Sequence, residues 1–371
     1  MRNWILLSMM VFEAFLLIYC LVRKSNHVPA GYLCAFLSLL LLIVTGWLLL
    51  FPKVEPLVAT GDYLVLHKTD YYIDHQRVEM YSEDGSYRKL PVAFWYPKEY
   101  SNGQSCPLVV FSHGSFGMKE SNETLFRELA SQGYIVCSID HTYQCFSTTL
   151  SNGKKVRLSS QFMKEVSMDK PNKKPKQSLV NFEKWMKIRT DDLNFVLDTL
   201  LEKSEKKEAT NTFLNLIDSS QICVMGHSLG GSAALGIGRQ RKDISAVISL
   251  EAPFLCDIQG VSDDNEFIFD QSEFPVPVLN IYSDATWEHL NEWKQYEENA
   301  RLLERESRKV QNIHFSGIGH FSLTDLSLTS PFLTSVFDGT KPQKGAEITL
   351  RKINDVCLKF LDQQLKKKET N

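Results

Sequence analysis

Two long apolar stretches open the chain, and a short polar segment separates them. Residues 4–22 and 30–51 are almost entirely apolar, and about 20 such residues suffice for a helix to cross the hydrocarbon core of a bilayer. The first stretch is too long for a secretory signal, and no small-residue cleavage site follows it. We therefore predict two transmembrane helices, which make residues 1–52 a membrane anchor.

The charged residues around these stretches bear on the orientation of the anchor. Arg23 and Lys24 lie between the predicted helices and favour a cytoplasmic loop, which places the rest of the chain outside the cytoplasm. Arg2 and Lys53 nearly cancel this bias, so the preference for an extracytoplasmic domain is slight. Glu13 lies inside the first stretch, where a carboxylate is costly, and we expect it to face the partner helix.

From residue 53 onward, short apolar runs alternate with segments of helical periodicity. The runs have the length and β-branched content of buried strands, and the segments between them repeat apolar residues every three to four positions. The runs are CPLVVFS, YIVCSI, QICVM, AVISL, VPVLNIY and VQNIHF. This alternation predicts one domain over residues 53–371, with a mostly parallel central sheet covered by helices on both faces. One of the expected helices spans 287–305.

A basic insertion at about residues 152–178 interrupts the alternation. Charge runs are usually solvated and mobile, and we expect the same here. The alternative is a lid, or a segment that touches an anionic membrane, where each basic side chain gains about 1 kcal/mol. The basic residues are Lys154, Lys155, Arg157, Lys164, Lys170, Lys173, Lys174 and Lys176.

Composition adds few constraints. The net charge of -3 and the pI near 6.3 give no indication of nucleic-acid binding. Cys20 and Cys34 lie in the predicted spans, while Cys137 and Cys223 lie in strand-like runs and resemble buried hydrophobic residues. We expect no metal, no cofactor and no obligate protein partner.

Candidate chemistry begins with the pentapeptide GHSLG at residues 226–230, which matches G-x-S-x-G. It follows a strand-like run and precedes a helical one, as this motif requires in an α/β-hydrolase fold. Glycines are needed there because a strand that turns at once into a helix strains the residue at its apex. Ser228 would then stand clear of the sheet as a nucleophile, and the alternative is a serine that only caps the helix.

A nucleophilic serine needs a base, an acid that orients the base, and donors for the oxyanion. His320 is the expected base, because it lies in the glycine-containing loop GIGHFS after the last predicted strand. His314 falls within a strand pattern, where a packed role is more common. His227 follows the geometry of the turn and points elsewhere.

Two amides and two carboxylates are candidates for the remaining roles. The loop FSHGSFG follows an early strand, from which this fold supplies one oxyanion donor, so we assign the N–H groups of Ser115 and Leu229. Glu251 ends the strand after the helix that follows Ser228, and Asp284 ends the next strand. Either can place a carboxylate behind His320, and sequence chemistry alone favours Asp284.

Several segments occur in an order and spacing that resemble the platelet-activating-factor acetylhydrolase family. They are TGDY, FWYP, VVFSHGSFG, LASQGYIVCSIDH, GHSLGG, SLEAPF and GIGHFS, and they cover nearly all of the chain from about residue 56. The resemblance implies that the acid is Glu251, although family members usually have aspartate there in an LD-x-W context. It also implies hydrolysis, without metal, of short or oxidised acyl esters at the second position of a glycerophospholipid.

The sequence therefore supports three hypotheses. The first is a membrane-anchored serine esterase of phospholipase type that forms an acyl-serine intermediate. The second is a general carboxylesterase or lipase acting on small or polymeric esters, because the fold does not fix the substrate. The third is a catalytically dead hydrolase domain used as a membrane-bound binding module. The presence of a candidate serine, histidine and two acids argues against this third hypothesis.

Overall fold

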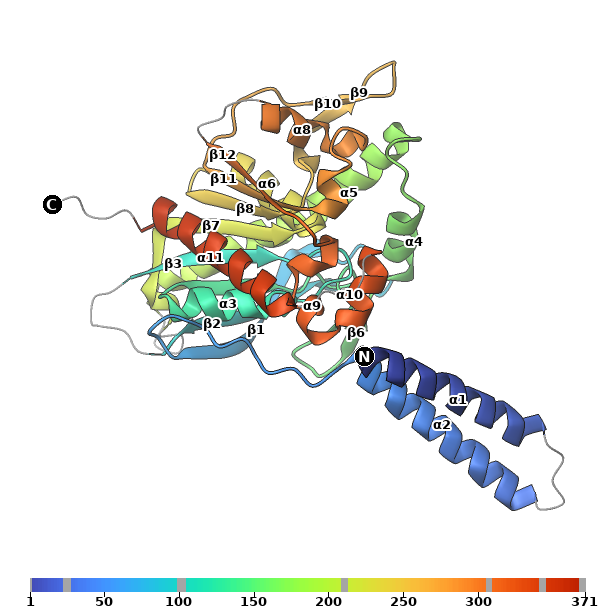
Figure 1. Cartoon of the computed structure of the whole chain (residues 1–371). Helices are drawn as coiled ribbons and strands as arrows, with labels where there is room; N and C mark the ends of the chain where they lie inside the picture. The colour runs from blue at the N-terminus through green and yellow to red at the C-terminus, as the bar shows by residue number, and fades with distance from the viewer. Residues whose placement is uncertain are drawn as a thin grey trace.

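The structure is a computed structural model that describes residues 2–22, 28–98, 105–207, 213–304, 309–339 and 345–366. Helices α1 (Arg2–Val22) and α2 (Val28–Leu50) pack side by side and project from the rest of the molecule as a hairpin (Figure 1). Thr45 of α2 donates a hydrogen bond of 3.0 Å to the Glu13 carboxylate of α1, so this acidic side chain faces the partner helix. Arg23 and Lys24, on which the predicted orientation depends, lie outside the described residues.

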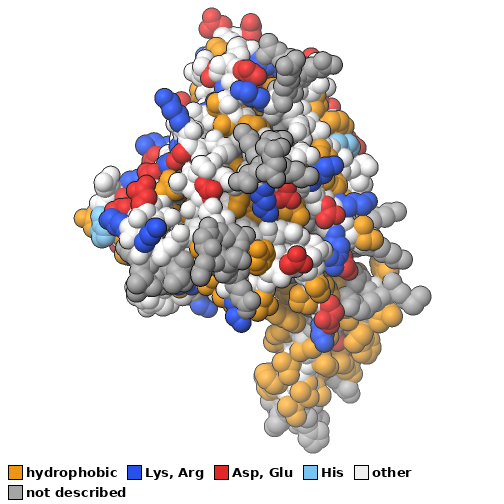
Figure 2. Space-filling view, turned by 90° about the vertical axis from the view of Figure 1, so that its left-hand side faces the viewer, with side chains coloured by type: hydrophobic (Ala, Val, Ile, Leu, Met, Phe, Trp, Pro, Cys, Tyr) orange, Lys and Arg blue, Asp and Glu red, His pale blue; other side chains and the backbone are white. Residues whose placement is uncertain are grey.

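Both helices of the hairpin are long and apolar. The candidate spans Trp4–Val22 and Gly31–Leu50 have mean hydropathies of 2.5 and 2.6. Only 6% and 22% of them are buried inside the molecule, unlike a core helix of a soluble protein. Figure 2 shows their hydrophobic side chains gathered on the projecting part of the molecule. Their length and composition fit membrane spans and also, at this end of the chain, a signal sequence.

The domain that follows contains an eight-stranded sheet in the order β1-β2-β4-β3-β7-β8-β11-β12. Its first two strands pair antiparallel with each other, and β2 pairs antiparallel with β4, whereas all later neighbours are parallel. This is the mostly parallel sheet expected of an α/β-hydrolase fold. The strands are β1 (Val65–Val78), β2 (Tyr87–Pro97), β3 (Cys106–Ser112), β4 (Ile135–Ile139), β7 (Ile217–His227), β8 (Ala246–Leu250), β11 (Val278–Ser283) and β12 (Val310–Phe315).

Helices cover both faces of the sheet, which explains why its parallel strands read as continuous apolar runs. In β3, Leu108 and Val110 join one hydrophobic core, while Val109 and Phe111 join the other. The first core is closed by α5 (Pro175–Glu205) and α6 (Leu229–Gln240), and the second by α3 (Glu123–Ser131) and α11 (Ala346–Gln364) (Figure 1). Alternate side chains of one strand therefore stabilise two separate layers.

The basic insertion is folded, unlike the mobile segment that its charges predict. It contains β6 (Lys155–Arg157), which pairs with β5 (Ser147–Thr149), helix α4 (Ser160–Met168) and the start of α5. Phe162 of α4 is completely buried, so the segment has an apolar anchor that the run of lysines obscures.

The segment 287–305 differs from the single helix that its periodicity predicts. The structure has α7 (Asp284–Trp287), a 3-10 turn at Lys294–Tyr296 and α8 (Glu297–Glu304). Leu290 and Tyr296 pack with Tyr282 of β11 in a small hydrophobic cluster of their own. Packing against the sheet thus breaks the helix that local periodicity favours.

The remaining helices and strands lie in loops at the edges of the sheet. They are β9 (Ile258–Val261), β10 (Phe267–Phe269), α9 (Leu326–Thr329) and α10 (Pro331–Asp338), with 3-10 turns at Leu214–Leu216, Leu255–Asp257 and His320–Leu323. Ser330, which precedes α10, donates a hydrogen bond to the Leu50 carbonyl at the end of α2. The hairpin and the domain are therefore in direct contact.

Candidate active site

The candidate site residues all follow the carboxyl ends of parallel strands. Ser115 comes after β3, Ser228 after β7, Glu251 after β8, Asp284 at the end of β11, and His320 after β12. Open α/β sheets place their ligands at this edge, because the carboxyl ends of parallel strands meet there. Residues far apart in the sequence are thereby gathered along one edge of the sheet.

Ser228 occupies a sharp turn between β7 and α6. Its backbone has φ 52° and ψ −126°, a conformation that is strained for a residue with a side chain. A Cβ atom on Gly230 would lie 2.0 Å from the Ser112 carbonyl oxygen, and one on Gly226 would lie 2.3 Å from the Gly230 backbone. The glycines are therefore required by close approach of the backbone to itself, and the Ser228 side chain remains partly exposed.

Replacing Gly230 with alanine is expected to destabilise the domain by about 3 kcal/mol or more, because the added Cβ would collide with two backbone oxygens. Thermal unfolding of the variant measures this effect. Gly260→Ala is the matched control, since a Cβ there meets only the end of Ile268 at 4.0 Å. Equal stability of the two variants would contradict this account of the turn.

His320 is paired with Glu251 rather than with Asp284. His320 Nδ1 lies 3.0 Å from Glu251 Oε2. A carboxylate can only accept, so Nδ1 carries the proton and Nε2 is left with a free lone pair. The other oxygen of Glu251 accepts hydrogen bonds from the Ser283 hydroxyl at 2.6 Å and from the amides of Ser283 and Thr286, both at 3.1 Å.

These contacts set the protonation of the pair. Burial alone would raise the pKa of Glu251, but the hydrogen bonds from His320, Ser283 and Thr286 outweigh it and hold the pKa at about 2. Burial lowers the pKa of His320, but the hydrogen bond and the charge of Glu251 raise it above the ordinary value of 6.5. Glu251 is thus ionised at neutral pH, and it stabilises the protonated form of His320.

Asp284 is engaged elsewhere. Its Oδ1 lies 2.7 Å from His314 Nε2, and its Oδ2 accepts the Gly317 amide at 2.6 Å. The His314 ring also stacks on Trp287, with ring centroids 4.5 Å apart. Asp284 therefore holds the loop that leads to His320 and does not contact His320 through a hydrogen bond in the described structure.

His227 has a contact that the sequence analysis missed. Its Nε2 donates to the His320 carbonyl at 3.2 Å, and the two rings lie 4.5 Å apart. Burial and the neighbouring His320 lower the pKa of His227 to about 3, so its ring is neutral. No local signal marks this role, because the two histidines come together only when β7 and the loop after β12 are assembled.

The two candidate oxyanion amides lie beside Ser228. The Leu229 N–H is the first amide of α6, and the first four amides of a helix have no partner within it. A Cβ on Gly114, the residue before Ser115, would lie 3.2 Å from the Ser228 Cβ, so the loop after β3 passes directly against the turn. Within the described residues, the Ser115 N–H donates to no other group.

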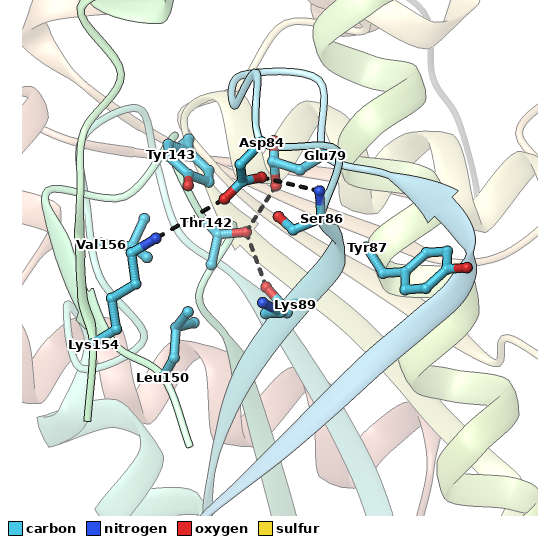
Figure 3. Close-up of a pocket in the computed structure, with 10 residues that line it drawn as sticks. All are labelled: Glu79, Asp84, Ser86, Tyr87, Lys89, Thr142, Tyr143, Leu150, Lys154 and Val156. Atoms are coloured by element: carbon cyan, nitrogen blue, oxygen red, sulfur yellow. Dashed lines mark hydrogen bonds and ion pairs between the residues drawn. The ribbon is translucent and has the colours of Figure 1, made fainter. Parts of the chain in front are cut away.

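Two further observations on the described residues concern the surroundings of this arrangement. No group of three His, Cys, Asp or Glu among the described residues is placed to hold a metal ion. The pocket in Figure 3 lies elsewhere, and none of Ser228, Glu251 and His320 lines it. Its walls come from the turn between β1 and β2, the start of β2, and the segment from Thr142 to β6.

The raised pKa of His320 predicts the pH dependence of turnover. A general base works only in its neutral form, so for His320 in the role predicted from the sequence, kcat/KM is expected to rise with pH and to reach half its maximum above pH 6.5. Below that midpoint it should fall about tenfold per pH unit. Initial rates in buffers of constant ionic strength measure this profile, and a midpoint below 6.5 would argue against a charged partner for His320.

Comparison with known proteins identifies relatives of the chain. The sequence model of the family "Platelet-activating factor acetylhydrolase, isoform II" matches residues 86–371. The chain is 24% identical to a platelet-activating factor acetylhydrolase of Gallus gallus over 281 residues, which is 72% of this chain and 64% of the relative. It is 22% identical to that of Cavia porcellus over 286 residues, 75% of this chain and 61% of the relative. The chain thus spans less than two thirds of the length of these relatives.

Other esterases are also similar. Cutinase est1 of Thermobifida alba is 28% identical over 156 residues, which is 42% of this chain and 37% of the relative. The solved structure of a ferulic acid esterase from Streptomyces cinnamoneus matches with a TM-score of 0.60 at 18% identity, covering 85% of this chain and 94% of the other, and supports the fold. The chain belongs to the platelet-activating factor acetylhydrolase family and has an α/β-hydrolase fold.

Proposed function

We propose that the chain is a membrane-anchored serine hydrolase that removes short or oxidised acyl groups from glycerophospholipids. Ser228 is the nucleophile, His320 the general base, and Glu251 the acid that orients the base. The observation that carries this proposal is the Glu251–His320 hydrogen bond of 3.0 Å beside the Ser228 turn. Together these residues have the composition and chain order of the catalytic groups of this fold.

The proposed reaction assigns a role to each of these residues. His320 Nε2 accepts the proton of the Ser228 hydroxyl as Oγ attacks the ester carbonyl, and Glu251 stabilises the resulting imidazolium. The N–H groups of Ser115 and Leu229 bind the oxyanion that forms. The tetrahedral intermediate expels the alcohol, which takes the proton from His320, and leaves an acyl-serine. Water activated by His320 then releases the acid and restores Ser228.

The hairpin of α1 and α2 supports membrane anchoring. Its side chains are mostly exposed although they are apolar, and such a surface is stable in lipid rather than in water. The Glu13–Thr45 hydrogen bond fits a polar contact between paired spans. The charge pattern of the sequence slightly favours an extracytoplasmic domain. An anchor of this kind would hold the site close to a lipid substrate.

The test is hydrolysis of a 2-acetyl glycerophosphocholine by the full chain solubilised in detergent. We expect turnover that depends on Ser228, with the Ser228→Ala variant as control. A fluorophosphonate probe run in parallel reports whether the serine is reactive, independently of the substrate. No reaction with either reagent would contradict the proposed chemistry as a whole.

A general ester hydrolase is the second candidate, because the chain is also similar to cutinases. Cleavage of nitrophenyl acetate without turnover of the phospholipid would favour this alternative. A catalytically dead binding module is excluded if the fluorophosphonate labels Ser228. The three outcomes separate the substrate question from the question of reactivity.

A further inference from the structure

An arginine without a carboxylate partner is buried behind the loop after β3. Arg189 lies in the middle of α5 and has no exposed surface. It forms no ion pair with any described carboxylate, since nearby Asp192 is paired with Arg77 and Arg88. Burying a cation is costly unless its donors are satisfied, so the contacts of this guanidinium call for an explanation.

The donors of Arg189 are directed at the loop that carries Ser115. Its Nη1 donates to the His113 carbonyl and, at 3.4 Å, to the Ser112 hydroxyl. Its Nη2 donates to the Gly114 carbonyl at 3.5 Å, and its Nε donates to Gln144 Oε1 at 2.8 Å. Burial lowers the pKa of Arg189 to about 9, so the guanidinium remains charged at neutral pH.

The Gly114 carbonyl belongs to the same peptide unit as the Ser115 N–H. A trans peptide is planar, so its C=O and N–H point in opposite directions. The carbonyl also accepts a hydrogen bond of 2.6 Å from His113 Nδ1, while His113 Nε2 accepts the His141 amide at 3.2 Å. Rotation of this peptide would break the hydrogen bonds from both His113 and Arg189, and fixing its carbonyl therefore fixes the direction of the N–H.

A second layer supports the loop from behind. Ser112 Oγ lies 2.8 Å from His141 Nε2, and His141 Nδ1 lies 2.8 Å from Asp192. This Ser–His–Asp array is completely buried, so it cannot meet a substrate and serves as scaffold. It continues through Arg88, which binds Asp192, to Glu79 and Thr142 on the wall of the pocket in Figure 3.

We propose that Arg189 is a positioning residue that orients the Ser115 N–H for oxyanion binding by holding the His113 and Gly114 carbonyls. This inference rests on the proposed function, because it requires an oxyanion at Ser228. Arg189 does not touch the substrate. Its effect is exerted through the peptide that joins Gly114 to Ser115, and it depends on the fork geometry of the guanidinium as well as on its charge.

The test compares Arg189→Met and Arg189→Lys with the wild type in the full, detergent-solubilised chain. Loss of one oxyanion donor costs about a hundredfold to a thousandfold in rate, so we expect kcat in Arg189→Met to fall about a hundredfold, with KM within about threefold. The kcat of Arg189→Lys should be about tenfold higher than that of Arg189→Met, because lysine keeps the positive charge but lacks the planar, forked donor geometry of the guanidinium. Rates are expressed per active site titrated with a fluorophosphonate.

The affinity for a trifluoromethyl ketone provides a second measurement, which would not change if Arg189 had a merely structural role. The ketone forms an anionic tetrahedral adduct with the serine, so its affinity should fall in parallel with kcat. Arg239→Lys is the control, since Arg239 lies on α6 and also makes several hydrogen bonds, but to Asp257, Ser272 and Glu273. We expect its kcat to stay within about threefold of the wild type.

The outcomes are distinct. Unchanged kcat in Arg189→Met, or a fall in kcat with unchanged ketone affinity, would overturn the proposal. If neither Arg189 variant folds, Gln144→Met removes the acceptor of Arg189 Nε, and a parallel fall in kcat and ketone affinity is again required. A wild-type chain that does not react with the fluorophosphonate would instead overturn the proposed function.

Discussion

Replacing Ser228 with alanine is expected to lower kcat for ester hydrolysis by about five to six orders of magnitude while the fold remains intact. The loss is large because Oγ forms the covalent bond to the acyl group in the proposed mechanism. Stability should be unaffected because alanine keeps the Cβ and meets the same backbone strain at φ 52°. The Ser228 hydroxyl, moreover, donates to no other described residue.

Two measurements check this prediction together. Initial rates on a 2-acetyl glycerophosphocholine and on nitrophenyl acetate give the loss of activity, and thermal unfolding gives the stability. Labelling by a fluorophosphonate should disappear in the variant. Turnover close to that of the wild type would refute the assignment of Ser228 as nucleophile, whichever ester is used.

Replacing Glu251 with glutamine is expected to lower kcat by about ten-thousandfold, whereas Asp284→Asn should cost less than about tenfold. The carboxylate of Glu251 accepts from His320 Nδ1, and it thereby fixes both the tautomer and the direction of the ring. An amide at this position can donate instead of accept, which favours the wrong tautomer. Asp284 accepts from His314 and Gly317, so its replacement acts only through the loop.

The pH profile separates an orienting acid from a merely structural residue. Glu251 raises the pKa of His320, so the midpoint of residual activity in Glu251→Gln should move to lower pH than in the wild type. In Asp284→Asn the midpoint should not move. The reverse pattern, with the larger loss and the larger shift in Asp284→Asn, would transfer the role of acid to Asp284.

Much of the fold follows from local patterns in the sequence. The parallel strands are buried on both faces, so their apolar runs are continuous and easy to recognise. The GHSLG turn is equally local, because its glycines are required by contacts within a few residues of Ser228 and with the neighbouring strand. The single helix expected over 287–305 is broken into shorter segments because Leu290 and Tyr296 pack against Tyr282, a contact that periodicity does not report.

The candidate acid is less predictable for a geometric reason. Glu251 and Asp284 end neighbouring parallel strands, so both carboxylates lie at the same edge of the sheet. Which of them reaches His320 depends on the loop after β12, and in the structure Asp284 is instead bound to His314 of β12 and to the Gly317 amide of that loop. The resemblance to a known family pointed to Glu251, whereas the residue types alone favoured Asp284.

The roles of His227 and Arg189 illustrate a further limit. Both donate hydrogen bonds to backbone carbonyls of distant segments. Every residue has a backbone carbonyl, so the sequence does not indicate which carbonyl is bound. Only the burial of a charged side chain without a carboxylate partner reveals the position of Arg189, and burial is known only from the assembled structure.

The strand order has a consequence for how the protein folds. The candidate oxyanion loop, nucleophile, acid and base follow four strands that are neighbours or near neighbours in the sheet but widely separated along the chain. Such long-range parallel pairing is slow, because loops must close before the contacts form. Recovery of esterase activity during refolding should therefore lag behind recovery of helical content. A nascent chain that ends before β12 lacks the histidine, so the chain becomes chemically competent only when its last strand is in place.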